Sequence, residues 1–240
     1  MSHHRWAVLG AIAVLPAAAA LAATPDRIAS TLGAVPSAGA VVLFDGTKTD
    51  AWCKQGTADP IEWKLVDEGG MEVSGGNITT REHFTDCRLH LEFREPLMAD
   101  ATGQGKGNSG VYLQGSYEVQ VLDSYGVKPI GPGDCGAIYG VSIARVNACK
   151  PPEQWQTYDI TFRAPRFDAD GKLVENARMS VYQNGILIQD NVEVPGPTTA
   201  AMERDVTQPG PLMLQDHGCP VRYRNIWMVP VTLNAKLEAE

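Results

Sequence analysis

One twenty-residue segment constrains the fold of this chain more than any other. Residues 107–126 read GNSGVYLQGSYEVQVLDSYG. Apolar and polar side chains alternate along it with the period of two that is typical of a half-buried β-strand. The odd positions carry the apolar side chains of Val111, Leu113, Tyr117, Val119 and Val121, and the even ones carry Tyr112, Glu118 and Gln120. This pattern predicts a β-hairpin with one apolar and one polar face.

The length of the turn at Gly115 decides which residues pair across the hairpin. A two-residue loop would place Glu118 opposite Leu113, on the apolar face, whereas a three-residue loop centred on Gly115 pairs odd positions with odd ones. We therefore predict the three-residue, bulged hairpin. Glu118 and Gln120 then project from the polar face, where hydrogen-bonding groups on rigid strands suit a ligand such as a sugar. A merely solvated outer face is the alternative.

The N-terminus indicates export. It reads MSHHRWAVLGAIAVLPAAAALAATPD, with a basic residue, an apolar run and an Ala-x-Ala site, which is the pattern of a cleaved secretory signal peptide. We expect a signal peptide over residues 1–23, an Ala/Ser/Pro-rich linker over 24–39, one domain over 40–233 and a tail over 234–240. The mature chain is then expected to be periplasmic or secreted and to have no membrane span.

Charge narrows the class of ligand. The chain of 240 residues has a formal net charge of −8, which argues against nucleic acid and against an anionic membrane surface as partners. A small neutral carbohydrate fits this charge better than an anionic ligand. The length suffices for one large all-β domain.

The five cysteines are Cys53, Cys87, Cys135, Cys149 and Cys219. In an exported chain this odd number leaves at least one thiol unpaired. Cys135 and Cys149 close a short loop and are the predicted disulfide; five buried free thiols are the alternative. The sequence contains no CxxC or HxxxH spacing, so we do not expect a zinc site. Acids and amides could hold Ca²⁺, but no EF-hand string is present, so the metal is left open.

Turn signals recur along the chain at the spacing of short antiparallel strands. Strand-like runs lie at 41–44, 63–66, 87–94, 157–164 and 179–189. The last contains Asn184-Gly185, which is the preferred pair for a two-residue type I′ turn. Helical periodicity is limited to 198–204, and no internal repeat is present. The sequence therefore predicts an all-β sandwich of two antiparallel sheets.

A second polar segment, residues 212–227, reads LMLQDHGCPVRYRNIW. We expect a strand that ends at Gln215, a turn at 216–218, and a new strand that carries Arg222 and Arg224 on one face. The imidazole of His217 titrates near neutral pH and could transfer protons. The alternatives are a structural Asp-His turn and a solvated pair of arginines.

At this point the motifs resemble those of a known family. They are LFDG at 43–46, WKLVDEGGMEV at 63–73, the 107–126 segment, CGAIYG at 135–140, TYDITFRAP at 157–165, QNG at 183–185 and the 212–227 segment. These motifs, and the order in which they occur over about residues 41–229, resemble those of the 3-keto-disaccharide hydrolase family. The resemblance implies a concanavalin-like jelly-roll sandwich. It also implies cleavage of 3-keto-glucosides by elimination across C1 and C2, followed by hydration of the 2-hydroxy-glucal.

The same resemblance supplies a set of candidate site residues. The positions that fall in the family's motifs are Asn108, Glu118, Gln120, Asp123, Tyr139, Gln215, His217 and Arg224. A ketone at C3 acidifies the hydrogen at C2, so the chemistry needs a base, an acid and a group that polarises the ketone, and no cofactor. We expect His217, Glu118 and Asp123 to be the catalytic candidates, Arg222 or Arg224 to polarise the ketone, and Gln120 and Gln215 to bind hydroxyls. A separate glycoside 3-oxidoreductase would supply the substrate.

Two other functions compete with this interpretation. A lectin-like module would bind sugars on the same sandwich without chemistry. A conventional glycosidase would need two carboxylates across the scissile bond, for which Glu118 and Asp123 are the attractive pair. Their odd offset places them on opposite faces of a regular strand, which weakens that alternative.

Overall fold

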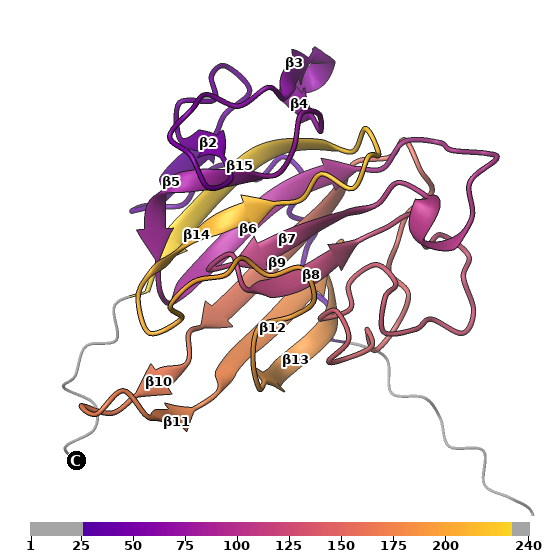
Figure 1. The fold of residues 1–240 in the computed structure, drawn as a ribbon. Coiled ribbons are helices and arrows are strands. Elements are labelled where there is room, and N and C mark those ends of the chain that lie inside the picture. The colour runs from indigo at the N-terminus through magenta and orange to yellow at the C-terminus, as the bar shows by residue number, and fades with distance from the viewer. Residues whose placement is uncertain (1–25, 232–240) are drawn as a thin grey trace, which may run out of the picture.

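A computed structural model describes residues 26–231 of the protein. Two antiparallel sheets pack face to face as a jelly-roll sandwich, so the predicted fold class is confirmed (Figure 1). The predicted signal peptide and the predicted tail from 234 onward lie outside the described residues. Within 26–231, no helix has the length and apolar character needed to cross a bilayer.

The described part of the chain contains fifteen strands and two short 3₁₀ helices, joined by turns and loops. They are β1 (Val41–Phe44), β2 (Trp52–Lys54), β3 (Lys64–Val66), η1 (Asp67–Gly69), β4 (Gly70–Glu72), β5 (Ile78–Phe84), β6 (Cys87–Arg94), η2 (Gly103–Gly105), β7 (Ser109–Leu113), β8 (Tyr117–Val121), β9 (Gln156–Arg163), β10 (Arg166–Phe167), β11 (Leu173–Glu175), β12 (Ala177–Gln183), β13 (Ile186–Val194), β14 (Gly210–Leu214) and β15 (Arg222–Pro230).

Neighbouring strands in each sheet are often distant in sequence. The eight-stranded sheet has the order β13-β12-β9-β6-β15-β4-β3, and β1 pairs with β15. The five-stranded sheet has the order β2-β5-β14-β7-β8. β10 and β11 form a separate two-stranded ribbon that extends away from the sandwich (Figure 1). The outer face of the five-stranded sheet, which points away from the core, carries the site described below.

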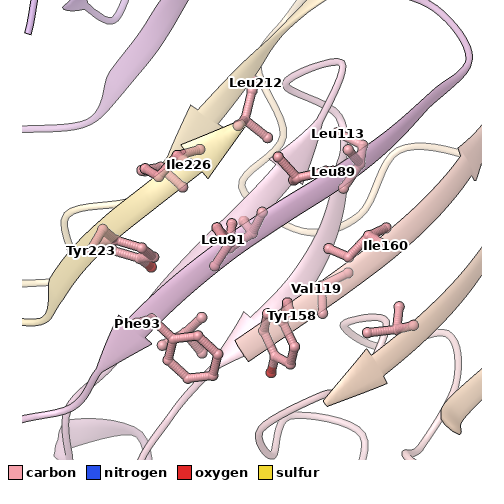
Figure 2. Close-up of a cluster of buried hydrophobic side chains, with 14 of the residues drawn as sticks. Leu89, Leu91, Phe93, Leu113, Val119, Tyr158, Ile160, Leu212, Tyr223 and Ile226 are labelled. Atoms are coloured by element: carbon pink, nitrogen blue, oxygen red, sulfur yellow. The ribbon is translucent and has the colours of Figure 1, made fainter. Parts of the chain in front are cut away.

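The core lies between the two sheets and follows the alternation in the sequence. Leu89, Leu91 and Phe93 of β6 point inward, opposite Val119 of β8 and beside Ile160 of β9 (Figure 2). Each is at most 2% exposed. Burial of such side chains, at about 25 cal/mol per Å² of apolar surface, is the main stabilising contribution to a sandwich of this kind.

Both predicted hairpins form with the predicted loop lengths. Leu113 pairs with Tyr117 and Val111 with Val119, so β7 and β8 are joined by the three residues 114–116. In the second hairpin Gln183 pairs with Ile186, which leaves the two-residue turn Asn184-Gly185. Both turn residues have positive φ, 53° and 78°, as a type I′ turn requires.

Several segments differ from the sequence-based expectation, and the short strands β2, β4, β10 and β11 were not predicted. β5 lacks a clear alternation, because Ile78, Thr79 and Thr80 are all buried, and was therefore not predicted. Residues 198–204 form an irregular loop rather than helix. The described part of the predicted linker is not detached: Leu187 donates to the carbonyl of Asp26, and the hydroxyl of Thr31 donates to Asp159 at 2.6 Å.

Candidate functional site

A small cavity opens on the outer face of the five-stranded sheet, at the end formed by β8, β7 and β14. Its volume is about 90 Å³, below the roughly 300 Å³ of the smaller drug-sized ligand pockets, so it fits part of one sugar ring. The residues that line it are Gln104, Asn108, Tyr112, Glu118, Gln120, Tyr139, Thr199, Ala200, Gln215 and His217. Six of the nine predicted catalytic and substrate-binding residues therefore meet at one place.

Glu118 lies at the base of this cavity and is 3% exposed. Its side chain lies over Gly110 of β7, where a β-carbon would come within 2.5 Å of Glu118 Oε1. Burial raises the pKa of Glu118 to about 7, and the Tyr112 hydroxyl partly offsets that rise. A carboxyl that titrates near neutral pH can accept or donate a proton under physiological conditions.

Tyr112 pairs with Glu118 across the hairpin and is fully buried. Its hydroxyl donates to the carbonyl of Thr199 at 3.3 Å and accepts a hydrogen bond from Gln215 Nε2 at 3.1 Å. Burial, and next the charge of Glu118, raise the pKa of Tyr112. Tyr112 therefore stays protonated and fixes the position of Gln215 at the cavity wall.

Three side-chain amides form one wall of the cavity. Gln120 Nε2 donates to Gln104 Oε1 at 3.1 Å and to the carbonyl of Gly133 at 3.2 Å. Asn108 Nδ2 donates to the carbonyl of Gln104 at 2.8 Å. Gln120 Oε1 is buried and has no hydrogen-bond partner among the described residues. A ligand hydroxyl at this position would satisfy it, and an unpaired buried acceptor otherwise costs about 1–3 kcal/mol.

His217 is exposed at the mouth of the cavity. The turn that carries it is fixed by Asp216, whose carboxylate accepts hydrogen bonds from the backbone N–H groups of Gly76 and Gly218, both at 2.8 Å. The N–H of Asp216 in turn donates to Asn77 Oδ1 at 2.7 Å. Asp216 is therefore a structural residue that holds the imidazole of His217 beside the cavity.

The structure does not bring Arg222 or Arg224 to this cavity. Both lie in β15 of the other sheet, on its outer face, because their alternate partner Tyr223 points into the core. Arg222 Nε donates to Glu72 at 2.7 Å, and Arg224 Nε donates to Glu92 at 2.7 Å. The guanidinium of Arg224 also lies 4.1 Å from the centre of the Trp155 ring. The prediction that one of these arginines polarises a ketone in the cavity is therefore wrong, because both lie on the other sheet.

Asp123 also lies outside the lining of the cavity. It follows β8 and forms an ion pair with Lys106 at 2.8 Å, with its side chain almost fully buried. Its other oxygen accepts from the N–H of Tyr125 at 3.2 Å. These contacts make Asp123 an anchor for the loop after β8, so the pairing of Glu118 with Asp123 that a two-carboxylate glycosidase needs is not formed.

Cys135 and Cys149 are adjacent and are free thiols in this structure. Their sulfur atoms and a carboxylate oxygen of Glu95 lie within 4.8 Å of one another, buried behind β8. Within residues 26–231 this is the one group of three Cys, His, Asp or Glu residues close enough to share an ion. It lies apart from the cavity, and the disulfide remains a prediction.

Four lining residues were not among the predicted set. Tyr112 could have been predicted, because it occupies an even position of the hairpin and so lies on the same face as Glu118 and Gln120. Gln104 lies in the short 3₁₀ helix η2, and Thr199 and Ala200 lie in an irregular loop, so none of them has a periodic sequence pattern, and they reach the site through long-range contacts. The N–H of Glu118, for example, donates to Oγ1 of Thr198 at 3.0 Å, which holds the neighbouring Thr199 and Ala200 at the cavity.

Comparison with known proteins identifies related chains. Residues 39–229 match a family described as the 3-keto-alpha-glucoside-1,2-lyase-like domain. No curated protein matches significantly.

Solved structures give the same fold. One, from Parabacteroides distasonis and provisionally classed as a glycosyl hydrolase, is 37% identical, with a TM-score of 0.74 over 81% of this chain and 84% of its own. A second from the same organism and so classed is 18% identical, with a TM-score of 0.59 over 81% and 94%. At that identity the second likeness shows the fold alone.

Proposed function

Because this chain belongs to the 3-keto-α-glucoside-1,2-lyase-like family and is a carbohydrate-active protein, we propose that it cleaves the glycosidic bond of 3-keto-glucosides. The reaction proceeds in two steps. Removal of the C2 proton and breakage of the bond between C1 and the leaving-group oxygen give the 2-hydroxy-glucal. Addition of water across C1 and C2 then gives the free 3-keto sugar, so the net reaction is hydrolysis.

The observation that carries this proposal is the position of Glu118. A carboxyl group with a pKa of about 7, buried in a recess that fits part of a sugar ring, matches the need for a base that removes an acidified C–H proton near neutral pH. No nucleophile is required for an elimination. Among the described residues that line the cavity, Glu118 is the one carboxylate, which disfavours the two-carboxylate glycosidase.

His217 supplies the second proton-transfer group. It lies at the mouth of the same cavity, where the leaving group would emerge, and its imidazole can protonate the departing oxygen and later help activate water. A lectin needs hydroxyl-binding amides but has no use for such an acid–base pair, so the pairing of Glu118 with His217 favours an enzyme.

Neutral donors of the cavity take the role first expected of an arginine. The enolate oxygen that develops at C3 needs a donor, and the second N–H of Gln215 Nε2 and the Tyr139 hydroxyl are at the cavity, whereas Gln120 presents its unpaired Oε1 to a substrate hydroxyl. Neutral donors fixed in a partly dry site can stabilise developing charge, each by about 2.7–4 kcal/mol in known oxyanion holes. Asn108 holds Gln104 in place and completes this wall.

We further propose that the enzyme acts after export, in the periplasm or outside the cell. The proposal rests on the N-terminal sequence pattern, which falls on residues outside the described range. An oxidoreductase that converts a glucoside to its 3-keto form must act before this enzyme.

The decisive test compares 3-keto-glucosides with their parent glucosides and follows release of the leaving group. The wild type should cleave the 3-keto substrate and leave the parent intact. Glu118→Gln and His217→Ala should remain folded and lose about 10²-fold or more in turnover, the usual scale of acid–base assistance. Arg222→Gln, outside the cavity, is the matched control and should retain turnover. Equal cleavage of the parent glucoside would contradict the proposal, and binding without cleavage would favour the lectin.

A further inference from the structure

A second cavity lies on the same outer face of the five-stranded sheet and has an unusual charge. Its volume is about 400 Å³, and the residues that line it are Cys53, Gly56, Thr57, Ala58, Thr79, Thr80, Arg81, His83, Met202, Arg204 and Pro211. Three of these side chains are basic, and the lining includes no acid. In a chain of formal net charge −8 this is a local reversal of sign.

The two arginines are positioned by backbone carbonyls rather than by carboxylates. Arg81 donates to the carbonyls of Asp50 at 3.0 Å and Ala58 at 3.1 Å. Arg204 donates to the carbonyls of Gln114 at 3.3 Å and Pro209 at 2.9 Å. Such bonds orient a guanidinium without neutralising its charge.

Neither guanidinium forms an ion pair with a described residue, whereas Arg166 and Arg224 do. Glu203 and Asp205 flank Arg204 in sequence, but neither forms an ion pair with it, and the Asp205 carboxylate accepts hydrogen bonds from Thr207 instead. Burial lowers the pKa of Arg204, and the charge of nearby Asp205 offsets that shift only in part. A bound anion would supply an ion-pair partner.

The geometry points to a binding site for the carboxylate of a sugar acid in this second cavity. Threonine hydroxyls of Thr57 and Thr79 border it and suit sugar hydroxyls. Its position relates it to the first cavity: Tyr112 pairs with Met213, and Met213 with Thr79, so two strand spacings of about 4.8 Å each separate the cavities. The segment 199–204 borders both.

Two sources could deliver this carboxylate: a free sugar acid, or an acidic leaving group of a glycoside whose sugar occupies the first cavity. The second source rests on the proposed function, and the first does not. The overall negative charge, which favours neutral ligands, is thus offset locally in this cavity.

The test is calorimetric titration with D-glucuronate and with D-glucose at fixed ionic strength, which needs no catalytic activity. Glucuronate should bind with one-to-one saturation and glucose should not. His83→Glu should weaken glucuronate binding about tenfold or more, because it adds an acid beside the arginines. Arg81→Gln should weaken it similarly. Arg178→Gln, which removes a half-buried arginine paired with Glu193 on the other sheet, should leave it unchanged.

Absence of saturable glucuronate binding, or binding that neither His83→Glu nor Arg81→Gln weakens, would overturn the site. A second arm separates the sources by comparing 4-carboxyphenyl and phenyl 3-keto-glucosides as substrates. A lower KM for the carboxylated substrate that His83→Glu abolishes assigns the site to the leaving group. Equal KM values, with glucuronate still bound, assign it to a free sugar acid.

Discussion

The carboxylate of Glu118 lies over the α-carbon of Gly110, so closely that a β-carbon on Gly110 would fall 2.5 Å from Glu118 Oε1 and 2.7 Å from the Tyr112 ring. Gly110 pairs with Gln120 and lies diagonally across from Glu118 on the neighbouring strand, and it leaves the space that the carboxylate occupies. The absence of a side chain at position 110 is therefore part of how the site is built.

Gly110→Ala should displace the Glu118 carboxylate, whose end can move, and crowd the buried Tyr112 ring, so the variant should lose most of its turnover and unfold at a lower temperature while still folding. Gly196→Ala is the matched control, since a β-carbon there meets no atom within 4 Å. Turnover of both variants on a 3-keto-glucoside, together with their thermal unfolding, checks this. Full activity in Gly110→Ala would show that the position of the carboxylate does not matter.

The raised pKa of Glu118 couples stability to pH. Because the pKa rises from 4.5 to about 7 on folding, the folded protein holds this proton more tightly than the unfolded chain does. The contribution is fully present below pH 4.5 and is lost as the pH rises to about 7. It corresponds to about 3 kcal/mol, at about 1.4 kcal/mol per pKa unit.

Glu118→Gln has no such proton to lose. The variant should unfold near the wild-type temperature at pH 4 and at a higher temperature than the wild type at pH 8. Glu82→Gln, which changes an exposed acid of β5, should show no such divergence. Parallel wild-type and Glu118→Gln curves across this range would mean that Glu118 is not buried as a titrating group.

The opposite face of the same strand should respond differently. Val119 is fully buried between the sheets beside Ile160 (Figure 2), so Val119→Ala should destabilise the protein by about 1–3 kcal/mol through lost burial and a cavity. Val174 is 57% exposed, and Val174→Ala should change stability by less than about 0.5 kcal/mol. Denaturant unfolding measures both, and similar small losses would place Val119 on the wrong face.

The adjacent thiols allow a test of the predicted disulfide. Oxidation of Cys135 and Cys149 would leave three of the five cysteines titratable after unfolding without reductant. Closing a loop of this length is expected to stabilise the protein by about 3 kcal/mol. A count of five thiols in protein purified from an oxidising compartment would show that the pair stays reduced beside Glu95.

Short-range patterns determined which parts of the fold and site could be predicted. The alternation along β7 and β8 and the Asn184-Gly185 turn define local geometry, and the structure confirms both. The assignment of Arg222 and Arg224 to the cavity was wrong, because sequence proximity to His217 does not reveal that the chain passes from one sheet to the other between β14 and β15. Contacts such as Thr198 to Glu118 join residues 80 positions apart and leave no periodic trace.

Elimination itself is tested most directly by turnover in D₂O. A 3-keto-glucoside should yield a 3-keto sugar with one deuterium at C2 from its first turnovers, because hydration of the 2-hydroxy-glucal takes its C2 proton from solvent. Preformed 3-keto sugar, incubated for the same time with enzyme, measures background exchange and should remain largely unlabelled. Product that retains hydrogen at C2 while the leaving group is released would contradict the elimination and require direct displacement at C1.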